Sequence, residues 1–491
     1  MQKIIFIALS TLFIFSIEKK EWITVEKEKP NILFISIDDL NDWPGFLGNF
    51  PKVHTPNMDK LAENGMVFNN AHCQAPICAP SRTSLFTGLY PHSTGLYYQF
   101  PDKEIHEGSE KAKNTIFLPD YFENHGYKTL GVGKIFHNGD KLSVFQEFGD
   151  VFQGFGPRPE TPLNYSSKWF SDIRRTGTDW GPMDLSDSEM TDYEIADWAI
   201  EKIGQNHEKP FFFAVGFIRP HVPWYVPEKW FDLFDINSIE TPPYLENDLD
   251  DVPEVSRRLH EMPAMPNTQW LIEEGKWKSM VHSYLASTAF VDHQIGRVLT
   301  ALENSPYRDN TIVVLWSDHG YHLGEKERTC KHSLWQRATR VPLVFAGPNI
   351  KKGSNTDAAV GLIDLYPTLL EMCGLPKYTA NEGHSLMPLI INPKEKWPHV
   401  AITSYGYKNI SLYDKNYHFI HYADGTGELY DLRKDPNEWD NLFDQPDFEK
   451  VVMQFKALMP KNHAPISPVN KINANEYIDA ELLKFGIEPQ Y

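Results

Sequence analysis

Two pairs of polar residues, each closely behind a short apolar run, have the composition of a cation site. Asp38-Asp39 follows the run at 31–37, and Asp318-His319 follows the run at 311–316. Three carboxylates and one imidazole suit a hard divalent cation, Ca²⁺ or Mg²⁺, better than Zn²⁺. Each pair taken alone is more typical of a solvated loop. The hypothesis of a cation site therefore depends on a fold that brings the two pairs together.

Short runs of apolar and β-branched residues alternate with amphipathic segments over most of the chain. This pattern predicts buried strands at 31–37, 128–132, 311–316 and 341–345, and helices at 55–62, 118–124, 277–302 and 364–372. The alternation indicates an α/β fold with a mostly parallel central sheet flanked by helices. Because sites in such folds lie beyond the carboxyl ends of the strands, both polar pairs are expected at one edge of the sheet.

The pattern changes near residue 394, where short strands separated by Asp-Gly and Asp-Pro turns begin. Strands at 400–404, 416–422 and 428–432 and a helix at 448–458 predict a smaller C-terminal α+β subdomain built on an antiparallel sheet. The expected domains are a catalytic domain over 28–393 and this subdomain over 394–491. A segment rich in proline and acidic residues, 243–268, is expected to be a surface insertion.

The N-terminus has the pattern of a signal peptide. Lys3 precedes an apolar stretch at 4–17 that is short for a bilayer, so residues 1–20 are predicted to be a signal peptide, with an uncleaved anchor as the alternative. Its removal implies a periplasmic or secreted protein without stable membrane association. Four cysteines in 491 residues do not indicate a disulfide framework, although one bridge stays possible.

The net charge of −19 restricts the classes of partner. Nucleic-acid-binding proteins usually carry a basic surface, so no nucleic-acid partner is expected. An anionic substrate requires instead a local group of cationic side chains within a pocket.

Two motifs are more specific than the acidic pairs. Cys78-Ala79-Pro80-Ser81-Arg82, followed by Thr87-Gly88, and the run GYKTLGVGKIFH at 126–137 resemble the two signatures of the type I sulfatases of the alkaline-phosphatase superfamily. The Asp-Asp pair, the Asp-His-Gly run and the stretch at 428–438 match the same family in order. The resemblance covers nearly everything after residue 30 and implies an alkaline-phosphatase-like fold and a sulfuric ester hydrolase.

In that family the motif cysteine is converted to formylglycine, which here implies that a maturation enzyme oxidises Cys78 to 3-oxoalanine. One hydroxyl of the hydrated aldehyde attacks sulfur, and the second allows the aldehyde to re-form and expel sulfate. This is covalent catalysis that divides a difficult displacement into two steps. The resemblance also implies one divalent cation, with Ca²⁺ favoured over Mg²⁺, and these ligands: Asp38, Asp39, Cys78, Asp318 and His319.

The resemblance gives roles to five further residues. Arg82, one helical turn beyond Cys78, is expected to hold the hydrate, and Lys134 and Lys331 to clamp sulfate oxygens. His137 is expected to take the proton in the elimination step. His221 is expected near the leaving oxygen, with Lys331 beside it as a candidate acid.

The Asp-His-Gly run, the Arg219-Pro220-His221 run and the stretch at 364–368 resemble most the iduronate-2-sulfatase-like branch of the family. This implies a sulfated, uronic-acid-containing polysaccharide or oligosaccharide, such as ulvan or a glycosaminoglycan. Cys330 is expected to be a packed thiol. Several residues are equally compatible with substrate contact and with a structural role: Arg219, His322, Trp43, Tyr97, Tyr98, Trp224 and Tyr225.

Two other functions are compatible with these motifs. A formylglycine-dependent phosphonate monoester or phosphodiester hydrolase shares the Cys-x-Pro-Ser-Arg run, and substrate preference separates it from a sulfatase. A non-catalytic carbohydrate-binding homologue would have lost at least one member of the residue set, and none is missing.

Overall fold

The computed structural model describes residues 29–137, 143–151, 154–166, 177–260, 262 and 265–470. The predicted signal peptide at 1–20 lies outside these residues. Within the described part of the chain, no helix is both long and apolar enough to cross a membrane.

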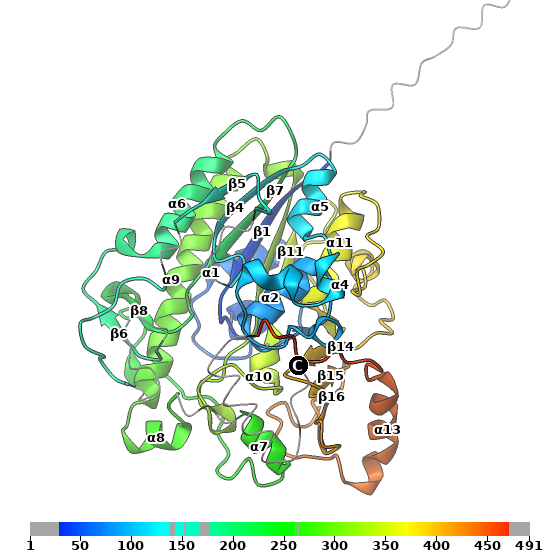
Figure 1. Ribbon diagram of the computed structural model, residues 1–491. Coiled ribbons are helices and arrows are strands. Elements are labelled where there is room, and N and C mark those ends of the chain that lie inside the picture. The colour runs from blue at the N-terminus through cyan, green and yellow to red at the C-terminus, as the bar shows by residue number, and fades with distance from the viewer. Residues whose placement is uncertain are drawn as a thin grey trace, which may run out of the picture.

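An eight-stranded sheet forms the centre of the larger part of the molecule (Figure 1). Its strands are β1 (Asn31–Ile37), β2 (Gly65–Phe68), β4 (Lys128–Gly133), β5 (Glu147–Gly149), β7 (Phe211–Phe217), β9 (Thr311–Ser317), β11 (Leu343–Ala346) and β12 (Ser354–Thr356). The order is β12-β2-β11-β9-β1-β7-β4-β5. β1 pairs in parallel with both β7 and β9, so the carboxyl ends of β1 and β9 meet at one edge, as expected.

One strand of this sheet runs against the others. β11 pairs antiparallel with both β9 and β2, whereas every other pairing in the sheet is parallel. The chain leaves β9 at the carboxyl edge, forms the loop at 318–339 and re-enters the sheet from that same edge. Because no helix carries it back to the opposite edge, β11 has to run in the reverse direction.

Helices cover both faces of the sheet, which confirms the predicted α/β class. α1 (Pro56–Glu63), α6 (Thr191–Ile203) and α9 (Trp277–Glu303) pack on one face, and α2 (Cys78–Thr87), α5 (Leu118–Asn124) and α11 (Leu365–Met372) on the other (Figure 1). β1 shows why both faces are apolar. Leu33, Ile35 and Ile37 join the first core and Ile32 and Phe34 the second, because successive strand residues point to opposite faces.

The C-terminal region is built on a separate antiparallel sheet, as predicted. Its four strands are β14 (Ala401–Ser404), β15 (Ile410–Tyr413), β16 (Tyr417–His421) and β17 (Gly427–Asp431), and α13 (Glu449–Leu458) packs on it. Phe455 of α13 stacks on Phe419 of β16 with ring centroids 5.4 Å apart. β15 was not among the predicted strands, and the domain boundary at 394 stays a prediction.

The remaining elements include a three-stranded sheet, β10-β3-β13, a two-stranded sheet, β6-β8, and short helices. They are β3 (Ala71–His72), β10 (Arg340–Val341), β13 (Val360–Gly361), β6 (Trp180–Met183), β8 (Trp224–Pro227), α3 (Pro91–Thr94), α4 (Glu110–Lys113), α7 (Glu254–His260), α8 (Thr268–Glu273), α10 (Gln336–Thr339) and α12 (Met387–Ile391). The segment expected as a surface insertion contains α7, whose Val255 and Leu259 are buried. That expectation was therefore too simple, because α7 anchors the segment to the core.

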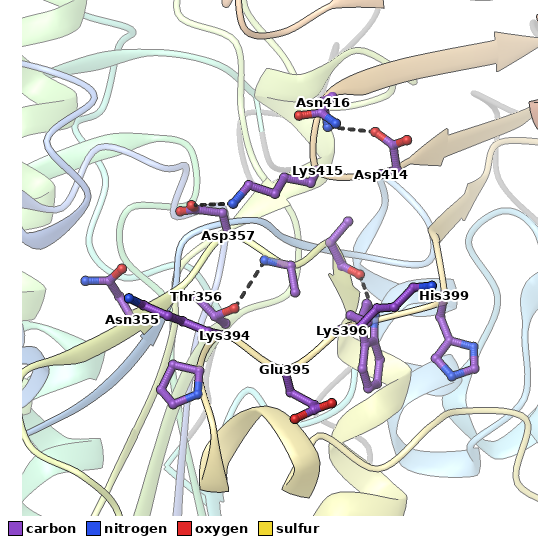
Figure 2. Close-up of a pocket in the computed structure, with 14 residues that line it drawn as sticks. Asn355, Thr356, Asp357, Lys394, Glu395, Lys396, His399, Asp414, Lys415 and Asn416 are labelled. Atoms are coloured by element: carbon purple, nitrogen blue, oxygen red, sulfur yellow. Dashed lines mark hydrogen bonds and ion pairs between the residues drawn. The ribbon is translucent and has the colours of Figure 1, made fainter. Parts of the chain in front are cut away.

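A groove of about 590 Å³ lies where the loop at 355–359, the segment at 393–399 and the turn at 414–416 meet (Figure 2). Lys415 pairs with Asp357 at 3.1 Å, and Trp397 donates its ring N–H to the Ala359 carbonyl at 2.9 Å. These contacts join the C-terminal sheet to the larger part of the molecule. None of the predicted site residues lines this groove.

Candidate active site

Cys78 begins helix α2 and is fully buried. The backbone N–H of Ala79, which has no partner within the helix, donates to the side-chain oxygen of Gln99 at 3.1 Å. Every residue of α2 is buried. The helix therefore fixes the direction of the Cys78 side chain, and places Arg82 one turn further on the same face.

The predicted cation ligands converge at the carboxyl ends of β1 and β9. Asp38, Asp39, Cys78 and His319 are buried, and one ligand atom of each lies within 4.8 Å of the others. Asp39 adopts a left-handed φ of 60°, which turns the chain sharply behind β1. The His319 Nε2 atom lies 3.1 Å from the Cys78 Sγ atom and 3.4 Å from Asp39 Oδ1. Its Nδ1–H donates to the Gly320 carbonyl at 3.0 Å, which leaves the Nε2 lone pair directed at the cluster.

Asp318 borders this cluster and is held by three donors. Its Oδ2 atom accepts from Arg82 Nε at 2.8 Å, and its Oδ1 atom accepts from the backbone N–H groups of Asp39 at 3.2 Å and His319 at 3.1 Å. Oδ2 also lies 3.6 Å from His319 Nε2. The carboxylate is therefore fixed beside the other ligands.

Cationic side chains balance the three carboxylates. Lys134 Nζ pairs with Asp38 and lies 3.8 Å from the Cys78 Sγ atom. Lys331 Nζ lies 3.0 Å from that sulfur and 2.8 Å from Asp39 Oδ1. Together with Arg82, these two lysines give three cationic side chains for the three carboxylates. A divalent cation added to this set would give the centre a net positive charge that attracts an anion.

Two histidines border the centre. His221 Nε2 lies 3.2 Å from Lys331 Nζ and 3.7 Å from Asp39 Oδ2, and its Nδ1–H donates to the Val222 carbonyl at 2.6 Å. Burial lowers the pKa of His221, against the effect of Asp39. His137 is half-buried, and its side chain lies close enough to the Cys78 thiol to lower the pKa of that thiol. Of the two predicted proton-transfer groups, His137 therefore lies beside Cys78, and His221 lies beside Lys331, which contacts Cys78.

The surrounding charges control the ionisation of the centre. Burial alone would raise the pKa of Cys78, but Lys134, Lys331 and His319 together hold it well below the usual value of a thiol. Burial would likewise raise the pKa of Asp38, and Lys134 with His221 and Arg82 holds it below its usual value. The centre thus favours negative charge on both side chains, as a cation site requires.

Several residues that support the centre were not predicted. Tyr284 of α9 donates its hydroxyl to the Asp39 carbonyl at 3.0 Å, and Ser81 donates to the Asp318 carbonyl at 2.5 Å. Phe155 stacks on His221 with ring centroids 4.4 Å apart. These are isolated residues without a local pattern, apart from Ser81, which belongs to the Cys78 motif.

The structure gives a structural role to residues whose function the sequence left open. Arg219 is buried and donates to the backbone carbonyls of His221 at 2.9 Å and Phe155 at 2.6 Å, so it holds the His221 loop. His322 is buried and bonded to Ser333 Oγ at 2.7 Å. The aromatic side chains are buried in the interior: Trp43, Tyr97, Tyr98, Trp224 and Tyr225. All four cysteines are free, Cys330 among them.

The fold and its cysteine centre define a class of enzyme, the hydrolases with an alkaline-phosphatase-like fold. A solved 2-O glycosaminoglycan (GAG) sulfatase superposes with a TM-score of 0.66 at 25% identity, over 88% of this chain and 91% of that one. Residues 30–375 match the family described as Sulfatase, and residues 324–464 match the C-terminal family of N-sulphoglucosamine sulphohydrolase. The chain belongs to the sulfatase family and is a sulfuric ester hydrolase.

Similar proteins of known name are also sulfatases. A sulfatase of Formosa agariphila is 46% identical, over 91% of this chain and 89% of that protein. Iduronate 2-sulfatase of Mus musculus is 31% identical, over 70% of this chain and 69% of that protein. An ulvan-active sulfatase of Formosa agariphila is 27% identical, over 90% of this chain and 82% of that protein. Sulfatases generally use formylglycine and a divalent metal, and the cluster around Cys78 contains a cysteine and a possible metal site.

We expect Arg82→Met to destabilise the fold more than any exposed ion-pair substitution. Arg82 is fully buried and pairs with Asp318 at 2.8 Å and Asp38 at 3.4 Å. Its removal leaves buried carboxylates without their partner, which costs about 3–5 kcal/mol of the free energy of unfolding. Urea unfolding followed by circular dichroism measures the loss.

Lys60→Met is the matched control for this substitution. Lys60 pairs with Glu303 at 3.4 Å, and its side chain is 66% exposed. The same change there is expected to alter the free energy of unfolding by less than about 1 kcal/mol. Equal stability of the two variants would contradict the structural importance of Arg82.

Proposed function

We propose that this enzyme hydrolyses sulfate esters on a uronic-acid-containing polysaccharide or oligosaccharide, such as ulvan or a glycosaminoglycan. The observation that carries the proposal is the surroundings of Cys78, whose sulfur lies 3.0 Å from Lys331 Nζ and 3.1 Å from His319 Nε2. Three similar proteins, an iduronate 2-sulfatase, an ulvan-active sulfatase and a 2-O GAG sulfatase, support the substrate class.

Cys78 is proposed to be converted to formylglycine, whose hydrate supplies the nucleophilic hydroxyl. The cation would be held by Asp38, Asp39, Asp318 and His319 together with residue 78, and Ca²⁺ fits this oxygen-rich set. Asp39 Oδ2 supports this assignment, because it is a buried carboxylate oxygen with no hydrogen-bond partner. When bound, a divalent cation polarises a sulfate oxygen and lowers the pKa of a coordinated hydroxyl.

The chain's own side chains divide the remaining work. Lys134 and Lys331 are proposed to hold sulfate oxygens, and Arg82 to fix the carboxylates around residue 78. His137 is proposed to accept the proton in the elimination step. His221, with Lys331 beside it at 3.2 Å, is proposed to protonate the leaving oxygen of the sugar.

The proposed setting of the enzyme is the periplasm or the exterior of the cell, after removal of a signal peptide. The maturation enzyme is proposed to act before folding is complete, since Cys78 and all of α2 are buried in the folded chain.

A panel of substrates tests the proposed function. Defined sulfated oligosaccharides from ulvan, heparan and chondroitin, a nitrophenyl sulfate and a nitrophenyl phosphodiester are incubated with the matured enzyme, and products are mapped by position. We expect desulfation of a uronic-acid-containing oligosaccharide. Preference for the phosphodiester would favour a phosphonate monoester or phosphodiester hydrolase. Binding without turnover of any ester would favour a non-catalytic carbohydrate-binding protein.

We expect His221→Gln to affect sugar sulfates far more than nitrophenyl sulfate. A sugar alkoxide is a poor leaving group and needs a proton from the enzyme, whereas nitrophenolate leaves without one. The expected loss of kcat is about 100-fold on the sugar sulfate and below about 10-fold on nitrophenyl sulfate. Steady-state kinetics on both substrates measures the difference.

His293→Gln, on the exposed side of α9, is the control and is expected to leave both activities unchanged. Equal losses on both substrates in His221→Gln would exclude a role for His221 in protonating the leaving group.

A further inference from the structure

A second pocket, of about 600 Å³, adjoins the chain segment that carries Lys331. Arg328, Thr329 and Cys330 line it and lead directly into Lys331, whose Nζ atom contacts the Cys78 sulfur at 3.0 Å. Because one residue spans at most about 3.6 Å, the Cα atoms of Arg328 and Lys331 are at most about 11 Å apart. Arg328 and Lys331 are therefore close together along one chain segment, although Lys331 itself does not line the pocket.

Arg328 is a buried cation in the wall of this pocket. Its side chain donates from Nη2 to Cys330 Sγ at 3.2 Å, and its Nε atom is buried without a hydrogen-bond partner. The guanidinium lies 5.7 Å from the ring centroid of Trp335. Among the residues that the structure describes, no carboxylate forms an ion pair with it.

Two of the three other lysine and arginine side chains of this pocket have carboxylate partners, and the third, Arg257, is exposed. Lys326 pairs with Asp248 at 2.8 Å, and Arg258 pairs with Glu254 at 3.1 Å. Arg328 differs from all three because it is buried and, within the described part of the chain, forms no ion pair with a carboxylate. A buried charge is destabilising unless it is paired and hydrogen-bonded, so this site favours an anion supplied from outside the chain.

We propose that Arg328 binds the carboxylate of a uronic acid in the substrate and thereby selects uronic-acid-containing sulfate esters. This inference rests on the proposed function. The planar fork of a guanidinium matches the two oxygens of a carboxylate. The net charge of −19 makes such a local cation necessary, because the surface as a whole repels an anionic polysaccharide.

The test compares a sulfated uronic-acid oligosaccharide with its carboxyl methyl ester, which has the same sulfate and the same shape but no carboxylate charge. The wild-type enzyme is expected to prefer the free acid by about 10- to 100-fold in kcat/KM, the effect of a hydrogen bond to a charged group. In Arg328→Met the preference is expected to fall close to one. Arg308→Met, which removes the same charge from a side chain that is 59% exposed, is expected to keep the full preference.

Two results would overturn the proposal. One is a wild-type enzyme that hydrolyses the acid and the ester equally well, and this result needs no variant that folds. The other is an Arg328→Met variant that loses the same factor on both substrates, which would make Arg328 a structural residue.

A binding measurement separates this inference from the proposed function. Calorimetry with the unsulfated acid and its ester needs no turnover. If no sulfate ester is hydrolysed, the proposed function fails, and the affinity ratio of the two unsulfated ligands still decides whether Arg328 recognises the carboxylate. Equal affinities would exclude that recognition.

Discussion

Cys78→Ser is expected to abolish multiple turnover while the fold is retained. A serine that stays a primary alcohol has no hydrated aldehyde, so it offers one hydroxyl for the attack on sulfur and none for the release of sulfate. The expected fall in steady-state kcat is at least about 1000-fold. Product formation followed over many enzyme equivalents measures it, and intact-protein mass spectrometry is expected to show a sulfo adduct on the variant.

Cys73→Ser is the matched control for this substitution. Cys73 is also a buried free thiol, five positions earlier, and its sulfur lies 3.8 Å from the Ala338 carbonyl, which a serine hydroxyl can use as an acceptor. This variant is expected to keep multiple turnover. Full turnover by a Cys78→Ser variant whose mass shows an unoxidised serine, or an unmodified Cys78 thiol in the active wild-type enzyme, would contradict the formylglycine proposal.

The sequence predicts β1 and β9, which lead to Asp38 and His319, because they are continuous apolar runs, whereas β7, which leads to His221, was not predicted. β1 (31–37) and β9 (311–317) are buried on both faces and lack polar interruptions, so their limits are clear from the sequence. β15 (410–413) was missed because it is only four residues long and follows a turn closely. The reversed direction of β11 was missed because it depends on where the preceding loop re-enters the sheet, and no local pattern records that.

The reactive residues of the candidate site were predicted from sequence motifs. The residues that hold them in place were not predicted. Asp38, Cys78 and His319 stand in recognisable runs, whereas Tyr284 is an ordinary helix residue until the fold brings it to Asp39, 245 positions away. The same holds for Arg328, which becomes notable only because it is buried and, among the described residues, forms no ion pair with a carboxylate. Motifs therefore identify residues that react, and tertiary packing decides which residues orient them and which could select the substrate.

Asp39→Asn is expected to remove the dependence of the enzyme on a divalent cation together with most of its activity. The Asp39 carboxylate is fully buried, lies 3.4 Å from His319 Nε2, and has one oxygen without a hydrogen-bond partner. An amide is a weaker ligand for a hard cation than a carboxylate. The wild-type enzyme is expected to lose at least about 100-fold in kcat on chelation and to recover it with Ca²⁺. The Asp39→Asn variant is expected to have, without chelation, the low activity of the chelated wild type, and Ca²⁺ is not expected to raise it.

Thermal unfolding provides a second readout that does not depend on turnover. A ligand that binds only the folded state at 100 times its Kd stabilises that state by about 2.7 kcal/mol, so Ca²⁺ is expected to raise the Tm of the chelated wild type. Asp292→Asn is the matched control, because Asp292 is also buried but accepts hydrogen bonds from Asn57 and the Met58 backbone in α1, outside the cysteine centre. It is expected to keep the Ca²⁺-dependent rise in Tm, and Asp39→Asn to lose it. If Ca²⁺ raised the Tm of both variants equally, the cation would have to bind at a site that does not include Asp39. A larger rise with Mg²⁺ than with Ca²⁺ would instead indicate a tighter, octahedral ligand set around Asp39.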